Sequence, residues 1–403
     1  MSFSQAVSGL NAASSGLDSI GNNIANSATN GFKGAHASFA DMFAGSGVGL
    51  GVNVAAVSQN FKDGAITRTD RATDVAISGN GFFRLLDGNG DVVYSRDGEF
   101  HRDKSGNLVN NQGMMVTGFP AGLDAAGNAT IQTGGIPQVL NIPTDMMSAK
   151  ASAKAEVTMN LNSDDKVITA AFDPDDPDTY SVSTTLTAYD SQGNTHDIAV
   201  YFIKTDDNKW IVKAKDSSDK TAAVEDLGDM EFDGNGKLKG TADFQFTYKG
   251  LNGADGGTID LSSNKTSQQK VTKSSVSKID IDGYQSGEYT SFKIENDGTI
   301  TASYSNQQKR TVGKIALSTF ANNNGLASQG GNVWKATNTS GNPMDGVPGT
   351  GQFGKLTGGA LEASNVDMSQ ELINMIVMQR NYQSNSQTIK TQDQMLQTLV
   401  NLR

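Results

Sequence analysis

The sequence predicts a mainly β protein with terminal α-helices: two β-rich domains in a nested arrangement, plus a helical coiled-coil domain formed by the N- and C-terminal segments. Three observations support this prediction. Both ends of the chain carry a seven-residue apolar repeat, whereas the middle carries short β-prone runs separated by Gly-containing turns. At 403 residues the chain is too long for one core. Its 45 glycines and 7 prolines suit hairpins joined by tight turns.

The N-terminal helix is expected over residues 4–27. Its apolar positions recur every seven residues, and a second set of small or apolar residues follows three positions later, as in a coiled-coil seam. Asp18 is the only charged residue before Lys33. With so few charges, the side of this helix opposite the seam is not expected to be fully exposed to water. The two sets are Phe3, Leu10, Leu17 and Ile24, and Ala6, Ala13 and Ile20.

The C-terminal helix is expected from about Asn365 to Arg403. Ser364 or Asn365 is predicted to cap it, and the acidic residues Asp367 and Glu371 suit its first turns. Leu372 widens the apolar stripe near the start of the helix. The main row of this stripe again has sevenfold spacing: Met368, Met375, Tyr382, Ile389 and Leu396.

Two interpretations of these helices are open. They pack on the body of their own chain, or they form a bundle with other copies, in which case they order fully only when those copies are present. Their place at opposite ends, next to Gly- and Asn-rich sequence, favours assembly. The residues predicted to form the assembly seam are Phe3, Leu10, Leu17, Ile20, Ile24, Leu372, Met375, Tyr382, Ile389 and Leu396.

The β sequence between the helices suggests a nested order of domains. Runs such as FFRLL and VVYS alternate with DGNG, RDG and DKSG, which supply the turns of successive hairpins. The expected division is a helical domain of 1–30 with 362–403, a Gly-rich connector of 31–70 with 325–361, a first β domain of 71–144 with 285–324, and an inserted outer β domain of 145–284.

Composition argues against several functions. The net charge of -11 disfavours nucleic acid and anionic membranes as partners. The absence of cysteine excludes thiolate sites, and His36, His101 and His196 lie far apart in the sequence. The DGNGD run at 87–91 lacks the sixth-position Gly and twelfth-position acid of a calcium loop, and the acidic loop Asp173–Asp178 suits solvent. We therefore expect no enzyme activity, cofactor or metal.

Neither a cleavable secretory signal nor a membrane span is expected. The start MSFSQAVSGLNAASSG has no basic n-region and no continuous apolar run. No stretch reaches the ~20 apolar residues of a transmembrane helix. By these rules the chain looks cytosolic, unless a dedicated machine exports it by reading an uncleaved N-terminus.

Both termini resemble a known family. IGNNIANSATNGFKGAHASFADMF at 20–43 and GALEASNVDMSQELINMIVMQRNYQSNSQTIKTQDQMLQTLV at 359–400 are similar to the terminal signatures of bacterial flagellar rod and hook proteins. DVAISGNGFF, YSRDGEF and GNLVNNQG resemble the first β domain of that family. Rod members are shorter and lack a large insertion, so residues 145–284 point to the hook members.

The resemblance implies a structural function. Hook subunits are exported unfolded, without signal cleavage, by the flagellar type III apparatus. Outside the cell they polymerise beneath a cap into a curved tube, a universal joint that transmits torque from rod to filament. The implied partners are other copies, the distal rod, the hook cap and the hook–filament junction proteins. The alternatives are a straight distal-rod subunit and, outside the flagellum, a secreted β adhesin.

Overall fold

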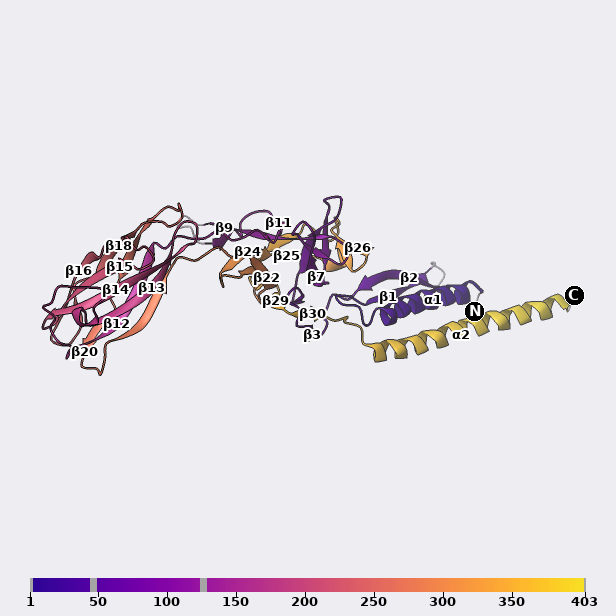
Figure 1. The fold of residues 1–403 in the computed structure, drawn as a ribbon. Coiled ribbons are helices and arrows are strands. Elements are labelled where there is room, and N and C mark those ends of the chain that lie inside the picture. Colours follow the sequence, from indigo (N-terminus) through magenta and orange to yellow (C-terminus); the bar gives the residue numbers. More distant parts are fainter. Residues whose placement is uncertain (1–2, 44–48, 124–128, 402–403) are drawn as a thin grey trace. The chain divides into compact units, whose positions relative to one another are not determined.

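The chain folds into two units, one inserted into the other. The structure, a computed structural model, describes residues 3–43, 49–123 and 129–401. The first unit comprises Met1–Pro143, Ser291–Ser303 and Lys309–Arg403, and the second comprises Thr144–Thr290 and Tyr304–Gln308. Strands predominate in both units, and the two long helices are α1 (Phe3–Ala25) and α2 (Met368–Asn401) (Figure 1). The predicted fold class, mainly β with terminal α-helices, is confirmed.

The start of α2 is capped by a residue other than the two predicted. The Asp367 carboxylate accepts hydrogen bonds from the backbone N–H groups of Ser369 at 2.9 Å and Gln370 at 3.2 Å. Asn365 instead uses its side chain to hold the backbone of Gly34, Asn60 and Lys62. Asp367 is the better cap because its negative charge also complements the positive end of the helix dipole.

A long hairpin follows α1 in the segment suggested as a Gly-rich connector. Strands β1 (Ala35–Phe43) and β2 (Gly49–Gln59) pair antiparallel, with Ala35 opposite Gln59. Three valines within GVNVAAV, at 52, 54 and 57, favour strand over linker despite the glycines, because β-branched residues are enriched in strands. The hairpin lies alongside α1 (Figure 1). The second suggested connector, 325–361, likewise contains short strands, separated by turns.

The β body of the first unit is one branched sheet of fourteen strands. Its aromatic core includes Phe82, Tyr94 and Trp334, whose rings take part in T-shaped contacts. Residues from both halves of the sequence build this sheet, so the first unit cannot form from either half alone. The strands are β5 (Phe82–Leu86), β6 (Val92–Ser95), β7 (Phe100–Arg102), β8 (Leu108–Asn110), β9 (Met115–Leu123), β10 (Ala129–Ile131), β11 (Gln138–Val139), β22 (Tyr289–Ile294), β23 (Thr299–Tyr304), β24 (Lys309–Ile315), β25 (Leu317–Thr319), β26 (Ala327–Gly330), β27 (Val333–Lys335) and β28 (Met344–Gly346).

Two small antiparallel sheets tie the segment that leads into α2 to the early part of the chain. In one, β29 (Lys355–Gly358) pairs with β4 (Val75–Ser78). In the other, β30 (Ala360–Glu362) pairs with β3 (Ile66–Arg68). The roots of the two helices are therefore held close to each other by strand pairing.

The second unit is a sandwich of two five-stranded sheets around its own core. Buried and exposed residues alternate along β15 and β18, as expected for strands with one face on a core. The first sheet contains β13 (Val182–Tyr189), β14 (Thr195–Asp206), β15 (Lys209–Asp216), β16 (Glu225–Phe232) and β17 (Leu238–Lys239). The second contains β12 (Lys154–Asn162), β18 (Asp243–Tyr248), β19 (Gly257–Ser262), β20 (Ser267–Gln269) and β21 (Ser275–Ile281). Single 3-10 turns lie at η1 (Pro177–Thr179) and, in the first unit, at η2 (Asn323–Gly325).

Candidate assembly surface

The two terminal helices pack against each other in opposite directions. A β-carbon placed on Gly9 would lie 2.8 Å from the amide of Asn385, and one on Gly16 would lie 3.2 Å from Met378 Sδ. Asn23 Nδ2 donates a hydrogen bond of 3.2 Å to Glu371. Residues 9, 16 and 23 thus meet residues 385, 378 and 371, a sevenfold spacing on both helices. Glycine allows this close approach because it has no side chain.

The β1–β2 hairpin covers a second side of α1. Ser8 Oγ accepts a hydrogen bond from Val52 N at 3.2 Å, and Ser19 Oγ donates one of 2.9 Å to Ala35 O. Asn23 also contacts Ala35, through two hydrogen bonds to its backbone. In one copy, α1 therefore has partners on two sides, α2 and the hairpin. The sequence predicted a joint domain of the N- and C-terminal helices, but it did not predict the contact of α1 with the hairpin.

The predicted apolar row of α1 faces a third side. Leu10 and Leu17 follow Gly9 and Gly16 by one residue, which rotates them by about 100° from the side that faces α2. Ser8 and Ser19 are rotated the other way, toward the hairpin, by about 60–100°. The row therefore points away from the hairpin. Phe3 is 54 % exposed at its start, while Leu10, Leu17 and Ile24 are half-buried.

The predicted apolar row of α2 faces the same side of the helix pair as the row of α1. Met375, Tyr382 and Ile389 each follow an α1-facing residue by four positions, a rotation of about 40°. The two helices run in opposite directions and face each other. A step of one or four residues toward the C-terminus therefore turns a side chain toward the same side of the helix pair in α1 and in α2. Leu372, rotated by about 100°, is 46 % exposed and Tyr382 is 38 % exposed.

Together these residues form one strip, which we call the open apolar face: Phe3, Leu10, Leu17, Ile24, Leu372, Met375, Tyr382, Ile389 and Leu396. Ile20 differs from the other predicted residues, because it is buried within the chain and lines the hollow between α1, β1 and α2. Within one copy, Phe3, Leu372, Tyr382 and Leu396 are exposed. The other five residues of the strip, Leu10, Leu17, Ile24, Met375 and Ile389, are half-buried.

The last turns of α2 extend past the start of α1. With Gly9 opposite Asn385, Phe3 falls opposite about residue 391, so the helix beyond that point has no α1 beside it. Leu396 and Met395 are each 57 % exposed there, and Val400 is 73 % exposed. Such a concentration of exposed large apolar side chains is typical of a binding surface.

A buried charge cluster fixes the roots of both helices. Lys33, just after α1, lies 2.6 Å from Glu362 Oε1, and Arg96 lies 3.2 Å from Glu362 Oε2. Burial, together with the nearby Arg96 cation, lowers the pKa of Lys33, although Glu362 opposes this shift. Lys33 also donates to Lys62 O at 2.7 Å, and Gly64 N donates to Glu362. The cluster joins four segments that are distant in sequence.

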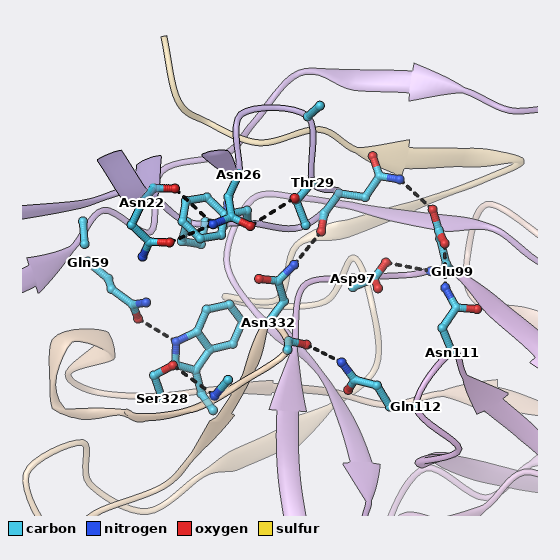
Figure 2. A pocket seen from close by; sticks show the side chains of 18 residues that line it. Asn22, Asn26, Thr29, Gln59, Asp97, Glu99, Asn111, Gln112, Ser328 and Asn332 are labelled. Atoms are coloured by element: carbon cyan, nitrogen blue, oxygen red, sulfur yellow. Dashed lines mark hydrogen bonds between the residues drawn. The ribbon is translucent and has the colours of Figure 1, made fainter. Parts of the chain in front are cut away.

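An amide-lined cavity of about 610 Å³ lies beside this cluster (Figure 2). Its polar side chains largely satisfy one another: Glu99 accepts hydrogen bonds from Asn30 at 2.6 Å and from Asn111 at 2.7 Å, and Asn332 donates to Asn30 O. Burial raises the pKa of Asp97, in the same wall, to about 6. These contacts anchor the loop after α1 to the β body, which orients the helix pair.

Within the described ranges, neither helix is long and apolar enough to cross a membrane. The same part of the chain holds no group of three or more His, Asp or Glu side chains arranged to bind a metal ion.

Family profiles match four segments that together cover about 70% of the chain. They are the flagella basal body rod protein at residues 4–33, the flagellar hook protein FlgE/F/G D1 domain at 76–159, the flagellar basal body protein FlaE D2 domain at 160–284 and the flagellar basal body rod FlgEFG protein C-terminal region at 357–402. Profiles shared by rod and hook proteins do not separate the two, so the full-length relatives decide.

The flagellar hook protein FlgE of Salmonella typhimurium is 54% identical over 406 residues, which cover 100% of both chains. This chain belongs to the flagellar hook protein FlgE family. FlgE of Escherichia coli K12 is 53% identical over 100% of both chains, and that of Borreliella burgdorferi is 33% identical over 98% of both. The crystal structure of Helicobacter pylori FlgE2 shares the fold, with a TM-score of 0.53 at 18% identity over 74% of this chain and 100% of that chain.

The predicted resemblance to flagellar rod and hook proteins is confirmed, and the full-length identity favours the FlgE hook subunit over a distal-rod subunit or an adhesin. Sequence reasoning missed two contacts within the chain that hold the assembly surface in place: the Gly9–Gly16–Asn23 contact row and the Lys33–Glu362 pair. The sevenfold spacing of Gly9, Gly16 and Asn23 is a signal that points to the first. A lone Lys after an uncharged segment points to the second.

Proposed function

We propose that this hook-family chain polymerises through the open apolar face into a curved tube, and that its function is structural rather than catalytic. The observation that carries the proposal is the open apolar face itself, a strip along both helices whose side chains are exposed or half-buried, and none fully buried, in one copy. Burying one such side chain contributes about 1.5–3 kcal/mol, so a repeated contact along the strip is strongly favourable.

A tube needs heterologous contacts, in which the strip meets a different surface of the next copy, because only these repeat without closing and generate a helical polymer. The apolar end of α2 beyond α1 suits contact with a further copy along the same tube. The second unit, with its many exposed ion pairs such as Lys239–Glu231, suits weak outer contacts that exchange as the tube bends. This arrangement supports the universal-joint role.

Leu10→Asp tests the proposal. A carboxylate at position 10 places a charge in the apolar contact, so the variant is expected to raise the concentration needed for polymerisation at least about tenfold. Asn89→Asp is the control, because it adds the same charge on an exposed turn of the β body, away from both helices. Electron microscopy of hooks on cells gives the readout. Normal hooks built from Leu10→Asp would overturn the proposal.

The further partners follow from family membership. We propose that the tube meets the distal rod at one end and the hook–filament junction proteins at the other, grows beneath a hook cap, and receives subunits through the type III export apparatus at the cell exterior. Mass spectrometry of subunits isolated from sheared hooks tests export without cleavage. The expected mass retains the N-terminal segment, and a mass lacking those residues contradicts the proposal.

A further inference from the structure

The outer faces of the two helices carry unpartnered charges of opposite sign. Asp18 is the only charged residue of α1 and is exposed. It follows Gly16 by two residues, which points it about 160° away from α2. Arg380 follows Met378 by two residues and likewise points away from α1. Within the described residues, neither side chain has an ion pair or a hydrogen-bond partner.

The remaining charges of α2 are arranged differently. Glu371 faces α1 and accepts the hydrogen bond from Asn23, and Asp393 accepts one from Gln397 on its own helix. Lys390 is exposed on the outer face, ten residues after Arg380, or about 15 Å along the helix. The outer face of α2 is therefore positive and that of α1 negative.

These charges cannot meet within one copy, because the helix pair itself separates them. With Gly16 opposite Met378, Asp18 lies at the level of Ile376, and Arg380 lies four residues away, about 6 Å along the axis. Two helix pairs laid side by side in the same orientation would bring α1 of one copy against α2 of the next. The extended Arg380 side chain spans a shift of that size.

We propose that Asp18 of one copy pairs with Arg380 of the laterally adjacent copy, and that this pairing sets the order of α1 against α2 around the tube. The occupant of each outer face is thus a second copy of this chain, recognised by complementary charge. The contact joins two different faces, so it repeats from copy to copy without closing a dimer. This inference rests on the proposed function, since it assumes that helix pairs assemble.

A charge-swap experiment on the full-length chain tests the pairing. Asp18→Arg and Arg380→Asp, each alone, are expected to raise the concentration of subunit left in solution at polymerisation equilibrium about tenfold at low salt. The double variant Asp18→Arg/Arg380→Asp is expected to return to within about threefold of the wild type. Lys390→Asp is the matched control, with the same change of charge on the same face, and is expected to shift the value less than about threefold.

Three outcomes would overturn the pairing: single reversals that polymerise like the wild type, a double variant that stays as poor as the single ones, or a Lys390→Asp effect equal to that of Arg380→Asp. Circular dichroism of each variant checks that the subunit is folded. Leu10→Asp separates the two proposals. If the charge reversals polymerise like the wild type while Leu10→Asp polymerises poorly, only the charge pairing is rejected. If Leu10→Asp polymerises like the wild type, the apolar contact is rejected.

Discussion

Lys33 and Glu362 form an ion pair of 2.6 Å although 329 residues separate them, and neither side chain is exposed to solvent. Lys33 follows α1, and Glu362 ends the last strand before α2. The pair therefore holds the roots of both helices at one point on the β body. A helix pair with a fixed root can present its open apolar face to other copies in a defined orientation.

Removing the carboxylate of this pair is expected to destabilise the first unit strongly. Glu362→Gln leaves the Lys33 ammonium and the Arg96 guanidinium buried without this counter-charge, at a cost of roughly 3–5 kcal/mol. Urea unfolding followed by Trp334 fluorescence in a Trp210→Phe background measures the change. The control, Asp91→Asn, removes the exposed Lys335–Asp91 pair and should cost under about 1 kcal/mol. Equal effects would contradict the role of the buried pair.

Asp97 is expected to make the first unit less stable as the pH rises from about 4 to 7. Burial raises the pKa of its carboxyl to about 6, so the folded chain holds this proton more tightly than the unfolded chain. Its contribution is full below the unfolded pKa of about 4 and is lost as the pH rises through 6.

Asp97→Asn, which is neutral at every pH, should therefore exceed the wild type in stability by roughly 1–2 kcal/mol at pH 7.5 and match it near pH 4. The same fluorescence signal, read at both pH values, provides the comparison. The amide oxygen of the variant can still accept the backbone hydrogen bond that Glu99 N donates to Asp97 Oδ1 in the wild type. A difference between variant and wild type that does not change with pH would contradict this explanation.

The close approach of α1 and α2 depends on Gly16. A β-carbon there already falls 3.4 Å from Phe39 Cζ as well as 3.2 Å from Met378 Sδ, so Gly16→Leu should force the helices apart. Since the chain has no cysteine, a Gly9→Cys/Asn385→Cys disulfide reports their contact. Its formation should slow at least about tenfold when Gly16→Leu is added. Gly21→Ala has no neighbour within 4 Å and should not slow it.

The second unit should be removable without loss of polymerisation. Met147 and Gly287 exchange backbone hydrogen bonds of 2.8 and 3.0 Å, so the chain enters and leaves this unit at adjacent points. Joining them through a short Gly-Ser linker deletes a sandwich that has its own core. Electron microscopy should show a tube with altered curvature or stiffness. Complete loss of polymer from a folded, exported variant would count against weak outer contacts.

The sequence predicted the elements that have strong periodic signals. The heptad rows at Leu10, Leu17, Met375 and Tyr382 predicted both helices, which the structure contains, whereas the role of these residues in assembly stays a prediction. Turn signals such as DGNG placed the hairpins of the β body. These predictions succeeded because side-chain period and turn chemistry are local properties.

The rest depended on contacts between distant segments. The α1–α2 contact row uses Gly9 and Gly16, which carry no hydrophobic signal and matter only because another helix approaches them. The Lys33–Glu362 pair joins opposite ends of the chain, and no local pattern links them. The β1–β2 hairpin was not predicted because its sequence is rich in glycine, and a Gly-rich composition is equally typical of a linker.

The most direct test of the central claim compares the reactivity of one side chain in the monomer and in the polymer. Leu10→Cys adds a single thiol to a cysteine-free chain and preserves an apolar side chain at position 10. Lys104→Cys, on an exposed turn of the β body, is the reference for general shielding. If copies bind through the open apolar face, maleimide labelling at position 10 falls at least about tenfold on polymerisation, relative to position 104. Equal labelling of position 10 in monomer and polymer would contradict the account.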